Sequence, residues 1–147
     1  MPQERILITV KTYPTLSRKY GELVCTAGIR LDGSWVRLYP IAFRRLDQRY
    51  EKYDWIETTI LKSRSDHRPE TYRLVDPTDI KKVEHVGTQD KWRERRRLLL
   101  KPENVYTLLK PLMDGAKTNR LSLSVFKPSK VKDFVWKACD RQWDQKK

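Results

Sequence analysis

The dipeptide Asp32-Gly33 constrains the fold of this chain more than any other short stretch. It separates two runs of strand-forming residues, 22–30 and 35–39, and Pro40 follows the second run. Asp-Gly between two such runs is typical of a tight β-hairpin, because both central positions of the favoured turn need a positive φ. The sequence therefore predicts that the two runs pair as antiparallel strands, the second of them closed by Pro40.

Alternation along the second run divides its side chains between two faces of a sheet. Trp35, Arg37 and Tyr39 share one face, and Val36 and Leu38 share the other. We expect the apolar pair in the core and the other three side chains on a contact surface.

Three further runs, residues 6–10, 55–61 and 71–75, are rich in β-branched and aromatic residues. Polar turns containing proline separate them. Five short strands joined in this way, without alternating helices, favour a small antiparallel barrel of the OB type over a parallel sheet. The predicted fold class is therefore α+β and mainly β, with a barrel-like part over residues 1–77.

The hydrophobic period changes after Pro77. Residues 91–100 are predicted to form a helix that has Thr88 as its N-cap. Trp92 and Leu99 are expected to pack inward from this helix.

A second helix is predicted after Pro102, and Pro111 should kink it or end it early. Alternation returns at residues 121–126 and 131–136, which are predicted as two further strands. Residues 78–147 would thus form a helical part with returning strands, and the whole chain of 147 residues suits one compact domain. The predicted inner face of the second helix consists of Val105, Leu108, Leu109 and Leu112.

Several classes of protein are excluded by composition. The longest apolar run, residues 6–10, is too short to span a bilayer or to form the core of a signal peptide. Cys25 and Cys139 are too few for a disulfide scaffold or a zinc site. Five Trp, seven Tyr and three Phe supply the large apolar side chains that disordered chains lack. We expect a folded cytoplasmic protein without a metal or another cofactor.

Charge indicates the kind of partner. The chain has 32 Lys and Arg against 19 Asp and Glu, a formal net charge of +13. Like charges destabilise a compact state, so such a surface implies an acidic partner. Nucleic acid is the expected one, because cations that neutralise phosphates release condensed counterions. A basic face kept for solubility and the docking of an acidic protein are the alternatives, and no long amphipathic helix indicates a membrane.

The densest positive charge lies at residues 93–97. Guanidinium groups are suited to phosphate, which makes Arg93, Arg96 and Arg97 candidate contacts. Helical spacing spreads the four arginines of this run over more than half of the helix circumference, so a solvated helix face is the alternative.

A second candidate group surrounds the hairpin. Cations that follow a backbone and rings that stack on bases can together bind a single strand. Trp35 and Tyr39 are the candidate stacking residues, although aromatic residues in strands also serve as core packing. The candidate cations are Arg18, Lys19, Arg30 and Arg37.

The polar loop at residues 63–70 is a third candidate. A hydrolase would use its carboxylates and histidine as metal ligands or as an acid and base pair. Its two arginines would instead neutralise the carboxylates, or hold a phosphate while the carboxylates orient them. His85 has no partner evident in the sequence, and no Walker, nucleotide-binding or nucleophile-elbow motif occurs. The ionisable residues of the loop are Arg64, Asp66, His67, Arg68 and Glu70.

Parts of the chain resemble a known family, the uncharacterised dual OB-fold proteins that occur near phage and mobile-element genes. In that family a Val-Cys-x-x-Gly stretch precedes a Gly and a strand carrying Arg-Leu, as Val24 to Gly28, Gly33 and Arg37-Leu38 do here. The resemblance implies an OB fold and nucleic-acid binding but no catalytic residues. Similar chains continue past residues 136–139, so this chain would lack a C-terminal part. The segments that carry the resemblance are residues 11–14, 20–29, 32–40, 65–70 and 124–128.

The sequence thus predicts a non-catalytic nucleic-acid-binding protein that uses a basic surface with interleaved aromatic residues. A protein-interaction adaptor or inhibitor that docks an acidic partner is the alternative. A metal-dependent nuclease is the least favoured interpretation, because the arginines of the loop compete with a divalent cation for its carboxylates.

Overall fold

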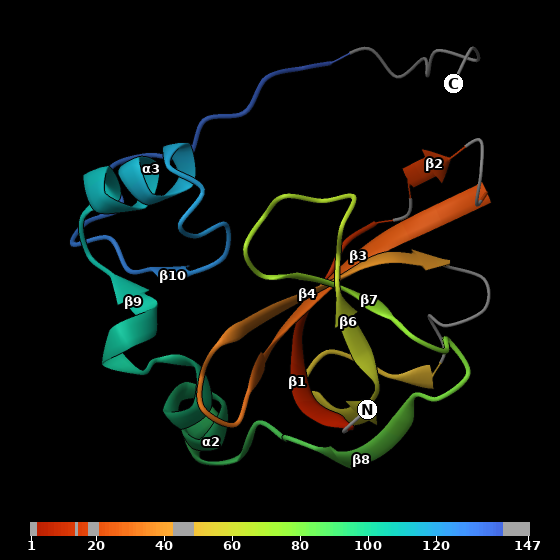
Figure 1. Cartoon of the computed structure of the whole chain (residues 1–147). Helices are drawn as coiled ribbons and strands as arrows, with labels where there is room; N and C mark the ends of the chain where they lie inside the picture. The colour runs from red at the N-terminus through yellow and green to blue at the C-terminus, as the bar shows by residue number, and fades with distance from the viewer. Residues whose placement is uncertain (1–2, 14, 18–20, 43–48, 140–147) are drawn as a thin grey trace.

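The computed structural model describes residues 3–13, 15–17, 21–42 and 49–139. Figure 1 shows a strongly curled β-sheet, with the helices and short strands of the C-terminal part to one side of it. The strands of the main sheet are β1 (Glu4–Lys11), β2 (Thr15–Ser17), β3 (Gly21–Arg30), β4 (Trp35–Ala42), β5 (Asp54–Thr58), β6 (Ile60–Lys62), β7 (Thr71–Leu74) and β8 (Lys81–His85). The remaining elements are α2 (Gln89–Leu99), the 3₁₀ turn η2 (Pro102–Asn104), β9 (Val105–Tyr106), α3 (Leu109–Lys117) and β10 (Val125–Phe126).

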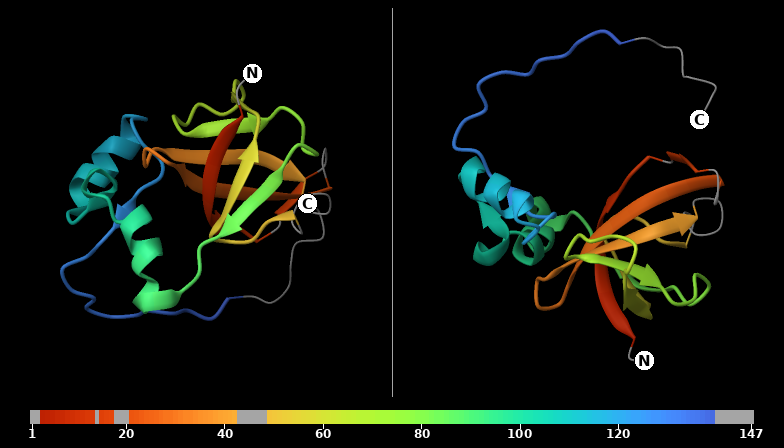
Figure 2. Two further views of the ribbon diagram at one scale, coloured as in Figure 1. Left: turned by 90° about the horizontal axis from the view of Figure 1, so that it is seen from below. Right: turned by 45° about the horizontal axis from the view of Figure 1, so that its top comes forward.

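The main sheet has the strand order β6-β7-β4-β3-β1-β5-β8, with β2 beside β3. Its pairs are antiparallel except β4 with β7, which run parallel. The curl brings the sheet into a half-barrel in the N-terminal part of the chain (Figures 1 and 2). The predicted mainly β fold, followed by helices and short strands, is confirmed.

The predicted hairpin is confirmed, but its turn has another form. The Gly33 N–H donates to the Arg30 carbonyl at 3.0 Å, and the Arg30 N–H donates to the Ser34 carbonyl at 2.9 Å. The loop therefore has three residues, Leu31 to Gly33, and within it only Gly33 has a positive φ, of 92°. A type I turn followed by a left-handed glycine needs one positive φ where the two-residue turn needs two.

Two strand boundaries differ from the prediction. β4 continues beyond Pro40, and β3 has a register shift opposite it, between Val24 and Thr26. Proline has no N–H to donate to the neighbouring strand, and a bulge at this point removes the need for that hydrogen bond. The predicted strand at 55–61 divides at Thr59 into β5 and β6, which pair toward opposite ends of the sheet.

Alternation along β1 gives the sheet two apolar faces. Ile6 and Ile8 lie in the larger buried cluster, whereas Leu7 lies in the smaller one. Val36 and Leu38 join the larger cluster, which confirms their predicted place in the core. The rest of the larger cluster is Val24, Ile41, Tyr50, Ile56, Ile60, Leu74 and Ile80.

The smaller cluster attaches α2 to the sheet. Leu98 is buried in it, and Leu99 packs against it, as predicted for Leu99. Trp92 is 55% exposed, so its predicted inward packing is wrong. Lys91 and Trp92 have φ values of 53° and 64°, and the right-handed helix begins only after them. Thr88 occupies the N-cap position, as predicted, but its side chain makes no capping hydrogen bond.

The C-terminal part differs most from the prediction. The second helix, α3, begins only at Leu109, since η2 and β9 occupy residues 102–106. Pro111 lies in the first turn of α3, where its missing N–H costs no helical hydrogen bond. Of residues 121–126 only the last two are in a strand, which pairs in parallel with β9. Residues 131–136 form no strand and are exposed. No helix in the described ranges is long and apolar enough to cross a membrane.

Candidate nucleic-acid interface

Helix α2 presents a hollow that three of the predicted phosphate contacts share. Arg93, Arg96 and Arg97 are spaced i, i+3 and i+4, so one helix face carries all three. The hollow has a volume of about 470 Å³. Four cations and one carboxylate line it, together with one leucine. Its full lining is Asp90, Lys91, Arg93, Arg96, Arg97 and Leu100.

The ion pairs in and around this hollow are exposed and therefore weak. Arg97 binds Glu94 through two hydrogen bonds of 2.8 and 2.6 Å, and this contact lowers the pKa of Glu94. Arg93 lies 3.5 Å from Asp90. Exposed pairs of this kind contribute little to stability and are screened by salt, so a polyanion can replace them. Arg96 makes no ion pair with any residue that the structure describes.

The hairpin group is divided between buried and half-buried positions. Arg37 is only 6% exposed and donates to the Ser122 hydroxyl at 2.9 Å. Trp35 packs against the smaller core cluster, and Tyr39 is half-buried. Arg37 is therefore not part of an exposed contact surface, because the segment around Ser122 covers it. The predicted contacts of Trp35 and Tyr39 stay predictions. Alternation along a strand assigns residues to faces but cannot show what packs over a face.

The remaining cations of this group are placed differently. Arg30 forms an ion pair with Glu4 and lies 4.8 Å from the centre of the Tyr72 ring. The guanidinium of Arg30 is thus already engaged by Glu4 of β1 and Tyr72 of β7. Arg18 and Lys19 lie outside the described residues.

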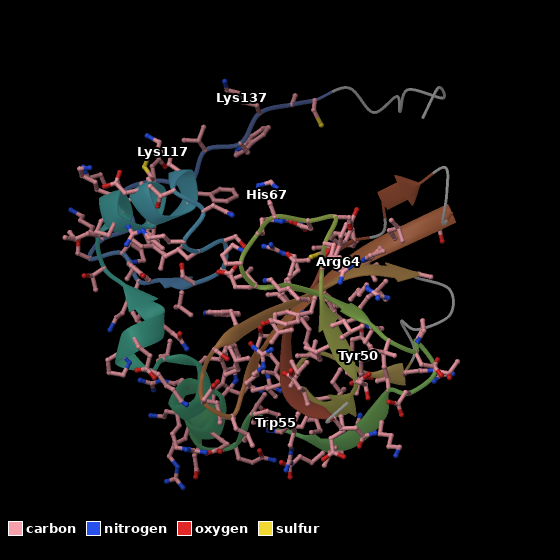
Figure 3. All side chains as sticks on the ribbon, viewed as in Figure 1. Tyr50, Trp55, Arg64, His67, Lys117 and Lys137 are labelled. Atoms are coloured by element: carbon pink, nitrogen blue, oxygen red, sulfur yellow. The ribbon has the colours of Figure 1, made fainter. Side chains whose placement is uncertain are left out.

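The loop between β6 and β7 is held by its own charges. Both carboxylate oxygens of Asp66 accept from the Arg68 Nε, at 2.9 and 3.0 Å. This contact holds the pKa of Asp66 far below its usual range. Glu70 accepts instead from the Ser122 N–H and hydroxyl, at 2.8 and 2.5 Å, so the expectation that it orients a guanidinium is wrong. Arg64 is exposed on the same loop (Figure 3).

A metal site is not formed by the described residues, in which no three His, Cys, Asp or Glu side chains come together. The loop connects β6 with β7 and is hydrogen-bonded to the C-terminal part of the chain. Asn119 adds a hydrogen bond of 2.7 Å to the His67 carbonyl.

The structure brings together one group of ionisable side chains that the sequence did not predict. His85 on β8 has its Nδ1 2.6 Å from the carboxylate of Asp54 on β5. Asp54 is fully buried and also accepts from Lys82 Nζ and the Glu51 N–H, both at 2.8 Å. The other ring nitrogen of His85, Nε2, lies 3.4 Å from Nη2 of Arg95 on α2. The sequence gives one indication of this group, because Asp54 directly precedes the apolar residues of β5. A carboxylate at such a position is rarely buried without a partner.

Burial alone would raise the pKa of Asp54. The hydrogen bonds from Lys82, the Glu51 N–H and His85 outweigh burial, so this pKa lies below its usual value. The carboxyl group is therefore ionised at neutral pH, and His85 Nδ1 is the donor in their contact.

Comparisons with curated proteins and with solved structures give no match. A family match covers the sheet and α2, and ends before α3. The chain belongs to the family described as a domain of unknown function (DUF8758), which matches residues 2–101.

Proposed function

We propose that this protein binds nucleic acid without strong sequence preference, and that the hollow on α2 is its main contact. The observation that carries the proposal is the grouping of Lys91, Arg93, Arg96 and Arg97 around one hollow on the surface of a strongly basic chain. Planar guanidinium groups bind phosphate oxygens through two hydrogen bonds, and such backbone contacts do not depend on base sequence.

Trp92 is the proposed stacking residue, although it does not itself line the hollow. It directly follows Lys91 in the chain and exposes 55% of its surface. A base that stacks on an indole contributes about 1–3 kcal/mol, whatever the identity of the base. Single strands, whose bases are free to stack, are therefore the preferred form. The resemblance of residues 6–40 to dual OB-fold proteins supports this function and a phage or mobile-element context.

The test is a binding titration by fluorescence anisotropy with labelled single-stranded DNA, duplex DNA and single-stranded RNA, each in two unrelated sequences. We expect micromolar or tighter binding at low salt, similar affinity for both sequences, and steep weakening as salt rises. The variant Arg93→Ala/Arg96→Ala/Arg97→Ala should weaken binding by about tenfold or more at low salt.

The matched control removes three exposed lysines elsewhere, Lys110, Lys117 and Lys130, and so loses the same charge. If both triple variants weaken binding equally, net charge alone explains the affinity and the α2 hollow is not the contact. Absence of binding at low salt would refute the function itself.

A second function, docking to an acidic protein, is favoured by the segment 127–139. All its residues are exposed, and Figures 1 and 2 show it as an extended trace that leaves the side of α3 in a wide arc. Phe134 and Trp136 are 84% and 77% exposed, and Lys132 and Lys137 flank them. Exposed apolar residues in one segment are typical of a protein contact. A pull-down that compares the wild type with the Phe134→Ala/Trp136→Ala variant distinguishes this function from nucleic-acid binding. The two changes should abolish capture of an acidic protein and leave the binding of oligonucleotides unchanged.

A further inference from the structure

We propose that His85 and Arg95 form a phosphate-binding site that takes up a proton when it is occupied. The site lies where β8 meets α2, beside but distinct from the hollow on α2. The proposal rests on the proposed function only for the source of the phosphate, since the chemistry of the site stands on the geometry of these two side chains.

The orientation of His85 is fixed from the buried side. Asp54 is fully buried and holds Nδ1 at 2.6 Å, while the His85 side chain is 40% exposed. Because the ionised carboxylate accepts the Nδ1 proton, Nε2 is the nitrogen that meets the outside. Lys82 occupies the second oxygen of Asp54, which leaves the aspartate no freedom to turn away.

Arg95 is held in place by two contacts that use neither of its terminal nitrogens. Its Nε donates to the Val86 carbonyl at 2.8 Å. Its guanidinium lies over the Tyr53 ring, with its central carbon 3.7 Å from the ring centre. Among the described residues no carboxylate pairs with Arg95, so its charge is not neutralised locally. A cation fixed in this way loses little conformational freedom when it binds an anion.

The contact between His85 Nε2 and Arg95 Nη2, at 3.4 Å, decides which ligand fits. A neutral Nε2 has only a lone pair, which Arg95 can approach but a phosphate oxygen cannot use. A protonated Nε2 donates to a phosphate oxygen, and Arg95 donates to a second one. Two adjacent cations repel each other, and the phosphate between them removes that repulsion. Binding of the anion and uptake of the proton therefore favour each other.

The charges around the imidazole do not supply this compensation by themselves. The single negative charge of Asp54 is shared with Lys82, which the Glu51 carboxylate also attracts. Glu84, the next acidic residue on β8, is paired with Arg5 at 2.7 Å. Protonated His85 beside Arg95 thus leaves an excess of positive charge, which an anion from outside neutralises.

The first experiment detects the site with inorganic phosphate alone. The chain has two histidines, so NMR signals of the imidazole protons are assigned with one variant, His67→Gln. Phosphate should shift the His85 signals at about pH 6 and much less at about pH 8, while His67 signals stay unchanged. The response should disappear in Arg95→Gln, provided its circular dichroism spectrum matches that of the wild type. Equal responses of both histidines, or none at either pH, would overturn the proposal.

The second experiment identifies the source of the phosphate. With a labelled single-stranded DNA, affinity should rise by up to about tenfold per pH unit for one proton taken up, between about pH 8 and pH 6. His85→Gln should abolish most of this rise, and His67→Gln should not. A response to inorganic phosphate without oligonucleotide binding would mean that a free phosphate compound is the ligand, and that the proposed function fails. Oligonucleotide binding with the same pH dependence in His85→Gln would refute this site and leave the function intact.

Discussion

Gly28 offers a stringent test of the packing of the half-barrel. It lies opposite Ile8 in the β1–β3 pair. A Cβ atom at this position would be 2.1 Å from the Leu7 carbonyl oxygen and 2.9 Å from Ile6 Cγ2. Van der Waals contact lies near 3.5 Å, so two paired strands would have to separate by roughly 1 Å or more. A strand in the middle of a sheet cannot make that movement without losing its hydrogen bonds.

The expected cost of Gly28→Ala follows from this geometry. Overpacking typically costs about 1–3 kcal/mol, and a backbone wall places this change at the upper end. The loss of chain entropy in the unfolded state returns about 0.4–1 kcal/mol, which leaves a net loss of about 2 kcal/mol. For a chain of this size we expect the melting temperature to fall by roughly 4–8 °C.

Gly115→Ala is the matched control. The new Cβ would be 2.8 Å from Leu121 Cδ2, which is the end of a flexible side chain. Replacing glycine in helix α3 by alanine also contributes about 1 kcal/mol of helix propensity, so the net change should be within about 1 kcal/mol. Thermal melts followed by circular dichroism measure both variants. An unchanged melting temperature in Gly28→Ala, or a larger loss in Gly115→Ala, would refute the argument.

Three further predictions concern the loop between β6 and β7 and the segment it holds. The pKa of Asp66 is lowered in the folded state because Arg68 binds it. The ion pair therefore stabilises the fold above the unfolded pKa near 3.8, and this contribution is lost as the pH falls below that value. Urea titrations should show that Asp66→Asn is less stable than the wild type near neutral pH and equally stable in strong acid. Ser122→Ala removes the hydroxyl that donates to Glu70, and hydrogen exchange of residues 119–124 should accelerate while the sheet stays protected. Purified protein should not cleave DNA or RNA with magnesium or manganese, and cleavage that Asp66→Ala/Glu70→Ala abolishes would show instead that the loop is an active site.

The sequence predicted the parts of the sheet that depend on local pattern. The turn at Gly33 and the core positions of Val36 and Leu38 follow from neighbouring residues alone. β8 was missed because its residues are charged or exposed, and it is a strand through its pairing with β5. Helical spacing of leucines did not indicate where α3 begins, because residues 102–106 pair and turn before the helix starts.

The candidate sites show the same division between local and distant effects. Arg93, Arg96 and Arg97 share a hollow because their spacing along one helix already places them together. The burial of Arg37 depends on Ser122, 85 residues further along the chain, and no pattern within a strand contains that contact. Asp54 and His85 are likewise joined only by the pairing of β5 with β8. Contacts between distant segments therefore had to come from the structure.

The salt dependence of oligonucleotide binding tests the central claim, that α2 binds phosphates, most directly. For a single strand the slope of log K against log salt concentration is about −0.7 for each phosphate neutralised. Removing Arg93, Arg96 and Arg97 together should make this slope shallower by about 2, whereas the control at Lys110, Lys117 and Lys130 should leave it unchanged. Equal slopes in the wild type and the arginine variant would contradict the account, as would a wild-type protein that does not bind at low salt.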